Sequence, residues 1–321
     1  MCTAITFESE DFFFGRTLDY ERSFGEEVVL TPRLFPLPFR HVPDPGRHFA
    51  ILGMALVSDE YPLYYDAMNE HGLCMAGLNF VGSARYGNPG TDKVAPFELI
   101  PWVLGRCTCA EEARTLLADT ALVEEDFSNS LPCARLHWII ADRSGCFTVE
   151  AVESGLRILD NPAGVLTNEP PFEAQMLRLS DFMHLSPAPP VNRFSAQLDL
   201  RAYSRGLGAM GLPGDLSSQS RFVRAAFTKL NAAPGGVGQA FHVLGAVEQV
   251  KGCCRLENGD QEHTLYTAVC NATRRVYHYA TYENRRICAV SMDAENLDAE
   301  TLKRFPLITT EDIRTLNGPG A

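Results

Sequence analysis

Residues 1–19 read MCTAITF-ESED-FFFGRTLD. The first and last pieces of this stretch are β-branched or aromatic and the middle piece is polar, which is typical of a β-hairpin with a four-residue connection. Counting outward from that connection pairs Phe7 with Phe12 and Cys2 with Thr17. The hairpin therefore returns the chain to its own beginning.

The return strand carries two charged residues toward Cys2. Side chains two positions apart share a face of a strand, so this count places Asp19 on the Cys2 side. Arg16 is an odd number of positions from Asp19, and a regular strand cannot direct both toward Cys2. We therefore expect a bulge, a twist or a strand end between them. The alternative is a surface ion pair beside a buried terminal strand.

Cys2 offers the chemical groups that a catalytic N-terminal residue needs. A small second residue permits removal of Met1, which would leave a thiol and a free α-amine on one residue. Because such an amine has a reference pKa of about 7.7–8.0, a usable fraction is a neutral base near neutral pH. One residue can then supply both nucleophile and general base. The alternative is that Met1-Cys2 is an ordinary chain start with no catalytic role.

The composition is that of an ordinary globular protein, with 321 residues, 45% hydrophobic and 21% charged. We find no linker, repeat or charge run, and therefore predict a single domain over residues 1–321. The net charge of −12 argues against nonspecific binding to nucleic acid. An anionic substrate would have to be bound by local arginines, against the overall field.

Several partners and locations are excluded by what the sequence lacks. No apolar run approaches the roughly 18–20 residues of a membrane helix, and the start has no signal-peptide pattern, so we expect a cytoplasmic protein. The ten cysteines have no disulfide-framework spacing. The pairs at 107–109 and 253–254 lack zinc-ligand spacing, so no metal is expected. No glycine-rich phosphate loop follows a strand, and no organic cofactor is expected.

The remaining pattern predicts an α+β fold, with helices covering stacked sheets. Thr108 and Glu111 fit a capping box at the start of a helix. The predicted strands are 72–80, the hairpin of 136–141 with 146–151 and the hairpin of 265–270 with 276–282; the predicted helices lie at 110–117, 222–230 and 241–247.

Seven motifs occur in a fixed order along the chain: MCT at 1–3, FGRTLDY at 14–20, MNEHGL at 68–73, AGLNF at 76–80, LTN at 166–168, GLPGD at 211–215 and SRF at 220–222. With them the chain resembles, nearly end to end, the choloylglycine hydrolase family of N-terminal nucleophile hydrolases. That family contains bile salt hydrolases and penicillin V acylases. The resemblance implies a four-layer αββα sandwich, no cofactor and a homotetramer.

The resemblance implies a role for each catalytic candidate. Cys2 would be the nucleophile, Asp19 would hold the new α-amine, and Arg16 would sit beside the thiol, where a cation favours thiolate. The backbone N–H of Asn79 and the side-chain amide of Asn168 would form the oxyanion hole.

Arg221 would complete the electrostatics of the site. Taken singly, Asn79 and Asn168 could be turn residues and Arg221 could pair with an acid at a helix start. Glu169 departs from the family pattern, in which a neutral residue often follows this asparagine. A carboxylate beside the oxyanion hole could slow the reaction, or it could equally point to solvent.

The AGLNF motif looks like that of bile salt hydrolases, which implies glycine- or taurine-conjugated bile acids as substrates. We expect Leu18 to line an apolar pocket for the acyl part, and Arg16, Asn79 and Arg205 to bind the substrate as well. The arginines would bind its anionic end, where Arg205 would suit a taurine sulfonate. Arg205 could equally be a solvated loop charge. The alternatives are a penicillin V acylase, another N-acyl amide hydrolase, or an inactive ligand-binding relative.

Overall fold

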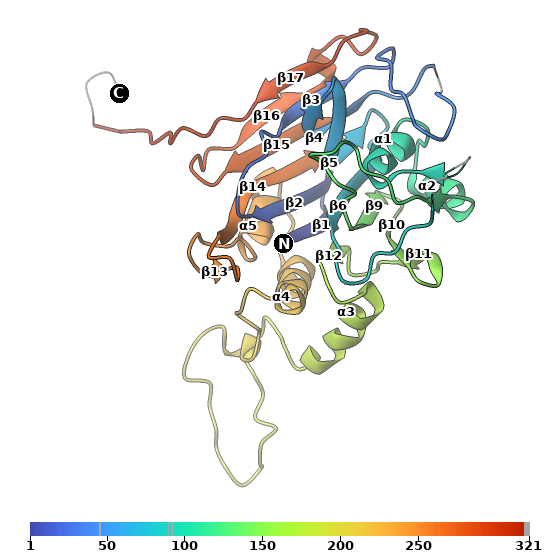
Figure 1. The fold of residues 1–321 in the computed structure, drawn as a ribbon. Helices are drawn as coiled ribbons and strands as arrows, with labels where there is room; N and C mark the ends of the chain where they lie inside the picture. The colour runs from blue at the N-terminus through green and yellow to red at the C-terminus, as the bar shows by residue number, and fades with distance from the viewer. Residues whose placement is uncertain (45, 89, 91–92, 318–321) are drawn as a thin grey trace.

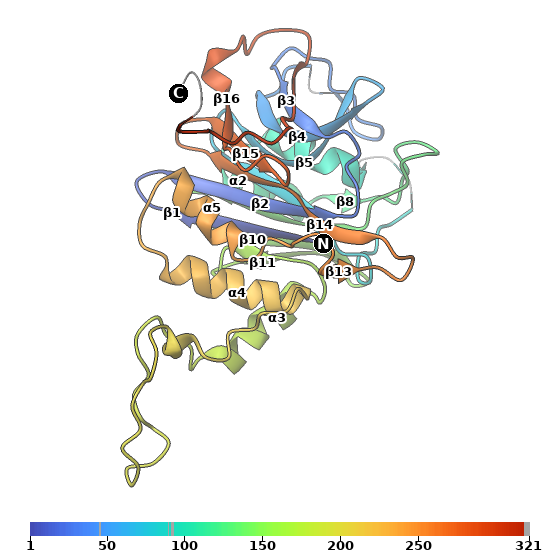
Figure 2. The same ribbon diagram turned by 90° about the vertical axis from the view of Figure 1, so that its left-hand side faces the viewer.

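The computed structural model describes residues 1–44, 46–88, 90 and 93–317. Two antiparallel sheets are stacked face to face, and helices cover the outer face of each (Figures 1 and 2). The layers run α, β, β, α, so the predicted four-layer sandwich is confirmed. In the part of the chain that the structure describes, no helix combines the length and the hydropathy needed to cross a bilayer.

The first sheet has the order β12-β1-β2-β14-β15-β16, and β13 also pairs with β14. The N-terminal hairpin lies in the interior of this sheet rather than at an edge, so the nucleophile candidate is held on both sides. The strands are β1 Cys2–Glu8, β2 Phe12–Tyr20, β12 Val165–Leu166, β13 Cys254–Arg255, β14 Gln261–Asn271, β15 Val276–Thr281 and β16 Cys288–Ser291.

The second sheet has the order β11-β10-β9-β6-β5-β4-β3-β17, and a small parallel pair, β7 with β8, lies apart from it. The strands are β3 Glu27–Thr31, β4 Ile51–Ser58, β5 Tyr61–Asn69, β6 Cys74–Asn79, β7 Lys93–Val94, β8 Ala121–Leu122, β9 Leu136–Asp142, β10 Gly145–Val152, β11 Gly155–Asp160 and β17 Lys303–Pro306.

The helices divide between the two outer faces. Helices α4 and α5 pack on β1, β2 and β14 of the first sheet, while α1 and α2 pack on the second sheet. Their bounds are α1 Leu99–Leu104, α2 Ala110–Ala118, α3 Phe172–Arg178, α4 Ser218–Asn231 and α5 Val237–Gly245; short 3₁₀ helices are η1 Pro96–Glu98, η2 Leu179–Phe182, η3 Leu207–Ala209 and η4 Met292–Ala294.

The predicted helical cap is displaced by one residue. Helix α2 begins at Ala110, so the third helical position is Glu112 and not Glu111. The Glu112 carboxylate accepts hydrogen bonds from the backbone N–H of Thr108, at 2.7 Å, and from its hydroxyl, at 2.8 Å.

The predicted register of the N-terminal hairpin is wrong by one residue. Glu8 belongs to β1 and pairs with Phe12, so the connection has three residues, and Cys2 opposes Leu18 instead of Thr17. A shift of one residue moves every side chain to the other face. Arg16 therefore shares the face of Cys2, and Asp19 lies on the opposite face, toward the helices.

The irregularity that we expected between Arg16 and Asp19 lies in the neighbouring strand. Strand β2 is regular, whereas the pairing of β14 shifts between Thr264 and Tyr266, opposite Asp19 and Leu18. No bulge in β2 is needed, because the two charged side chains do not share a face.

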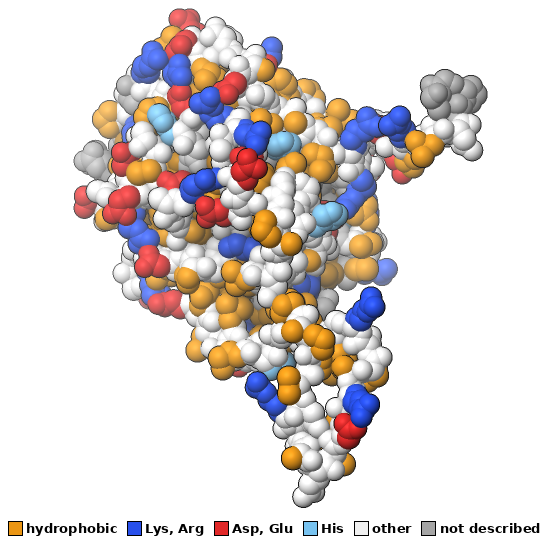
Figure 3. All heavy atoms as spheres, turned by 180° about the vertical axis from the view of Figure 1, so that it is seen from behind, with side chains coloured by type: hydrophobic (Ala, Val, Ile, Leu, Met, Phe, Trp, Pro, Cys, Tyr) orange, Lys and Arg blue, Asp and Glu red, His pale blue; other side chains and the backbone are white. Residues whose placement is uncertain are grey.

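One segment leaves the body of the molecule. Between η2 and η3 the chain forms a long loop, called here the projecting loop (residues 184–206), which extends away from α3 and α4 (Figures 1 and 2). It exposes large apolar side chains, with Phe194 at 81% and Tyr203 at 83% exposure. Seen from the other side, hydrophobic side chains gather on the body around its base (Figure 3).

Candidate active site

The Cys2 thiol and the Arg16 guanidinium form the centre of the site. Both side chains point from the first sheet toward the second, and both are buried. Arg16 Nη2 donates to Cys2 Sγ at 2.8 Å. Its other terminal nitrogen donates to the backbone oxygens of Tyr65, at 2.9 Å, and Gly77, at 3.0 Å. The guanidinium is thus held by backbone groups of the second sheet while it donates to the thiol of Cys2.

A buried acid that no sequence motif marked lies next to Arg16. Asp66 in β5 is 3.9 Å from Arg16 Nε and accepts hydrogen bonds from the hydroxyls of Tyr266, at 2.9 Å, and Tyr277, at 2.6 Å. Burial raises the pKa of Asp66, although Arg16 and both hydroxyls oppose that shift. Burial alone would lower the pKa of Arg16, but its neighbours Cys2, Tyr266 and Asp66 raise it, so the arginine stays cationic.

Asn79 lies at the end of β6, where its backbone N–H is directed into the site. The next residue, Phe80, donates its N–H to Arg135 beside β9. Because N–H groups alternate sides along an antiparallel strand, the Asn79 N–H points away from β9, toward β5. The pairing of β5 with β6 stops at Asp66 and Ala76. No ladder partner of β5 therefore faces the Asn79 N–H.

Asn168 follows β12 and reaches the same point from the first sheet. Its Oδ1 accepts from Cys2 N at 2.9 Å and from Arg221 Nη2 at 2.7 Å, which assigns Oδ1 as the acceptor. Its Nδ2 donates one hydrogen to the backbone oxygen of Asn79 at 2.9 Å. An amide nitrogen carries two hydrogens, so one remains for a ligand.

Arg221 comes from the first turns of α4 and is fully buried under β1. Its Nη1 donates to Cys2 O at 2.5 Å and to Thr3 Oγ1 at 2.6 Å. Burial lowers the pKa of Arg221, partly offset by Asp19 and Cys2. Arg221 therefore fixes both the backbone of Cys2 and, through Oδ1, the amide of Asn168.

Asp19 lies on the helix side of the sheet and is held by neutral donors. Its Oδ1 accepts from the Thr264 hydroxyl at 2.6 Å, and its Oδ2 accepts from Gln249 Nε2 at 3.0 Å. Arg221 Nη1 is 3.9 Å away. With Met1 present, Cys2 N is an amide bound to Asn168, so contact of Asp19 with the mature α-amine stays a prediction.

A pocket of about 220 Å³ opens over Cys2. Among its lining residues are four of the predicted site residues, Cys2, Arg16, Leu18 and Asn79, and its other walls are mostly apolar. These walls are Tyr20, Phe24, Leu56, Leu63, Tyr64, Tyr65, Gly77, Pro96, Phe97, Ile100, Phe127, Leu131, Pro132, Ala134 and Leu136. Arg205 is exposed on the projecting loop and does not line this pocket.

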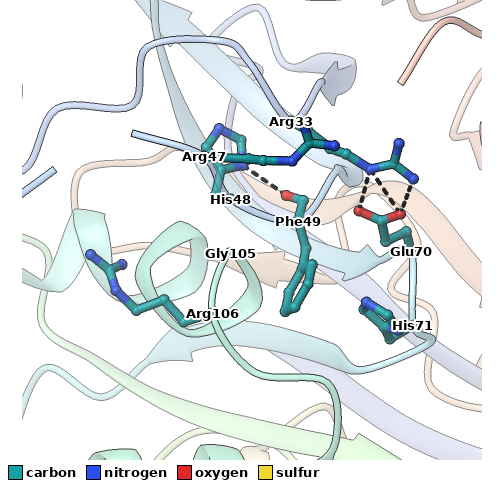
Figure 4. A pocket seen from close by; sticks show the side chains of 8 residues that line it. All are labelled: Arg33, Arg47, His48, Phe49, Glu70, His71, Gly105 and Arg106. Carbon is teal, nitrogen blue, oxygen red and sulfur yellow. Dashed lines mark hydrogen bonds and ion pairs between the residues drawn. The ribbon is translucent and has the colours of Figure 1, made fainter. Parts of the chain in front are cut away.

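A second hollow differs from this pocket in having several charged side chains in its lining. Its lining includes Arg33, Arg47, Glu70 and Arg106, but not Cys2 (Figure 4). Arg33 forms a forked ion pair with Glu70, and Arg33 and Arg47 both contact Asp298, at 3.1 and 2.9 Å. The charges of Arg33, Arg47 and Glu70 are therefore paired within the protein. The pocket at Cys2 contains four of the predicted site residues, so it is the candidate active site.

A buried pair supports the segment that carries Asn168. His137 Nδ1 lies 3.1 Å from Glu150 Oε1, and His137 Nε2 lies 3.0 Å from the backbone oxygen of Thr167. All three are fully buried. No local motif marked this pair, although two ionisable residues in apolar strands are themselves a signal of a specific contact. Among the described residues, no group of three potential ligands could hold a metal ion.

The four-layer sandwich, with a thiol on the first residue of the interior strand β1, is the architecture of the N-terminal nucleophile hydrolases. Residues 2–305 match the model of the linear amide C–N hydrolases, choloylglycine hydrolase family. The chain belongs to this family and is a linear-amide C–N hydrolase.

Individual relatives agree with this assignment. The chain is 50% identical to a bile salt hydrolase/transferase from Lactiplantibacillus plantarum, covering 96% of this chain and 97% of that protein. A mutant conjugated bile acid hydrolase from Clostridium perfringens superposes with a TM-score of 0.92 at 31% identity, over 99% of this chain and 100% of that one. Penicillin V acylase from Agrobacterium tumefaciens shares the fold, with a TM-score of 0.73 at 20% identity, over 94% and 90% of the two chains.

Proposed function

We propose that this protein hydrolyses the amide bond of glycine- and taurine-conjugated bile acids, with Cys2 as the nucleophile. The observation that carries the proposal is the Arg16-bound thiol of Cys2 at the base of an apolar pocket. The names of the relatives from L. plantarum and C. perfringens support the substrate class.

The reaction begins after removal of Met1. The Cys2 thiolate attacks the amide carbonyl, and the C–O π electrons move to the oxygen. The α-ammonium donates a proton to the amide nitrogen, the C–N bond breaks, and glycine or taurine leaves as the amine. Water, deprotonated by the α-amine, then attacks the thioester and releases the free bile acid. No cofactor takes part.

The oxyanion would be bound between the two sheets. The Asn79 N–H and the second hydrogen of Asn168 Nδ2 would donate to it together, and the bond from Nδ2 to Asn79 O, which holds the two residues side by side, supports this pairing. Donors fixed before the reaction need no reorganisation as charge develops. Arg221 keeps the Asn168 amide in this orientation by occupying Oδ1.

The pocket suits the acyl part of the substrate. Its apolar walls can pack against a steroid, whereas Arg16, at its base, is directed to the thiol. A volume of about 220 Å³ is below the roughly 300–1,000 Å³ of sites that enclose a drug-sized ligand. The far end of the steroid would therefore extend past the mouth of the pocket.

The test is direct release of amino acid from taurocholate and glycocholate, with penicillin V in parallel. Hydrolysis of either conjugate that disappears in Cys2→Ala supports the proposal. Hydrolysis of penicillin V alone would assign the acylase activity instead. No turnover of any amide by correctly processed protein would favour a ligand-binding relative.

The projecting loop supports a second proposal, assembly into a homotetramer. Its exposed Phe194 and Tyr203 have no apolar partner in their own chain's described core, and Arg205 lies too far out to line its own pocket.

We propose that Arg205 contacts the substrate's anionic end in a neighbouring subunit and favours taurine. In Arg205→Gly, kcat/KM for taurocholate should fall more than for glycocholate. Equal losses or no loss would contradict this role, and a monomeric mass by light scattering would contradict the tetramer.

We also propose a cytoplasmic location. All ten cysteines are free in the structure, including exposed Cys253, and free thiols persist in a reducing compartment. Fractionation of the native host, with the activity followed in each fraction, tests this placement.

A further inference from the structure

Glu169 is the residue after Asn168, and its carboxylate is hydrogen-bonded within the protein. Its Oε1 accepts from the backbone N–H of Ser83 at 2.9 Å, and its Oε2 accepts from the Ser83 hydroxyl at 2.8 Å. Both side chains are half-buried. The approach is close, since a Cβ on the neighbouring Gly82 would lie 3.2 Å from Glu169 Oε1.

This contact joins the two segments that carry the oxyanion donors. Ser83 lies four residues after Asn79, beyond the end of β6 in the second sheet. Glu169 lies one residue after Asn168, beyond β12 in the first sheet. Between these segments the other hydrogen bond runs from Asn168 Nδ2 to Asn79 O. An oxyanion hole needs its donors at about 2.7–3.1 Å from one oxygen, so its width depends on the spacing of the two sheets here.

We propose that Glu169 is a positioning residue: its forked hydrogen bond to Ser83 sets the distance between Asn79 and Asn168. The proposal rests on the oxyanion role assigned to these asparagines above. Glu169 does not line the pocket over Cys2 and acts through the two segments that it joins. The carboxylate is thus turned toward Ser83, and both of its oxygens accept hydrogen bonds there.

Replacement by glutamine separates geometry from charge. In Glu169→Gln the amide oxygen can accept from Ser83 N–H, and the amide nitrogen can donate to the Ser83 hydroxyl, which accepts equally well. We expect Glu169→Gln to keep kcat within about twofold, and Glu169→Ala to lower kcat about tenfold, a smaller loss than deletion of a donor itself. KM should change by less than about threefold in both, because the donors act mainly on the transition state.

A double-mutant cycle tests the pairing. Ser83→Ala removes one of the two bonds and should lower kcat by less than Glu169→Ala. The double variant should be no slower than Glu169→Ala alone, because the two residues act through one contact. The matched control is Glu173→Ala, which removes a neighbouring exposed glutamate that pairs with Arg157 at 2.7 Å on the outer surface. It should keep the wild-type kcat.

Each possible result either supports or overturns the role of Glu169. A wild-type kcat in Glu169→Ala, an equal loss in Glu169→Gln, or losses that multiply in the double variant would each overturn the proposal. Should Glu169→Ala fail to fold, Ser83→Ala decides alone: an unchanged kcat overturns the proposal, and a lowered kcat with unchanged KM supports it. Asn168→Ala is assayed beside these variants. If it is as active as the wild type, the oxyanion assignment fails; if it alone is slow, only the role of Glu169 fails.

Discussion

Replacing Asn168 with alanine tests the centre of the proposed site. The change deletes three hydrogen bonds: from Cys2 N, from Arg221 Nη2 and to Asn79 O. It also deletes the hydrogen that would reach the oxyanion. Loss of one oxyanion donor costs about 10²–10³ in kcat, or roughly 2.7–4 kcal/mol in the barrier. We therefore expect kcat to fall by at least about two orders of magnitude, with a smaller change in KM.

The same change affects stability, and the assay must separate the two effects. Cys2 N–H and Arg221 Nη2 lose a buried acceptor, and each unpaired group costs about 1–3 kcal/mol unless water replaces the amide. We expect a lower midpoint of thermal unfolding, so rates are measured well below it. Asn168→Asp is the matched variant, because one carboxylate oxygen can still accept from Cys2 N and Arg221. Its other oxygen cannot donate, so kcat should fall while the fold is kept.

A change confined to KM in Asn168→Ala would mean that the residue binds the ground state or only shapes a turn. Full activity in Asn168→Asp would mean that no hydrogen on this side chain reaches the oxyanion.

Three further predictions concern maturation and stability. Intact-mass analysis of active protein should show that Met1 is absent, and Cys2→Ala should abolish turnover with little change in unfolding temperature; active protein that keeps Met1 would exclude the mechanism. Gly53→Ala should destabilise by at least about 2 kcal/mol, because the new Cβ would lie 2.1 Å from a backbone oxygen of β5; Gly145→Ala, which meets nothing within 4 Å, should be nearly neutral. Hydrogen bonds from two serines lower the pKa of Asp215 to about 2, so its stabilisation is complete above the unfolded value near 3.8 and is lost as the pH falls toward 2. Asp215→Asn should therefore unfold at a lower temperature than wild type at pH 6, and the two should converge near pH 2; a constant difference would exclude this linkage.

The sequence predicted the strand pairs and helical stripes well, because these follow from local periodicity. The stripe at 222–230 lies in α4, and the hairpins at 136–151 and 265–282 form as expected. The family prediction is confirmed by the match over residues 2–305. Errors arose where one residue changes the outcome: the connection after Glu8 is three residues long, and Asp19 consequently faces the helices.

The sequence alone was enough to name the candidate reacting groups and their order, since Cys2, Arg16, Asn79 and Asn168 each stand in a motif that can be read along the chain. Only the tertiary structure decided how they meet. The two asparagines belong to different sheets, Asp66 reaches Arg16 from 50 residues away, and Glu169 finds its partner in Ser83. Such contacts depend on sheet stacking and strand register, which are set by packing across the whole core, and no local spacing encodes them.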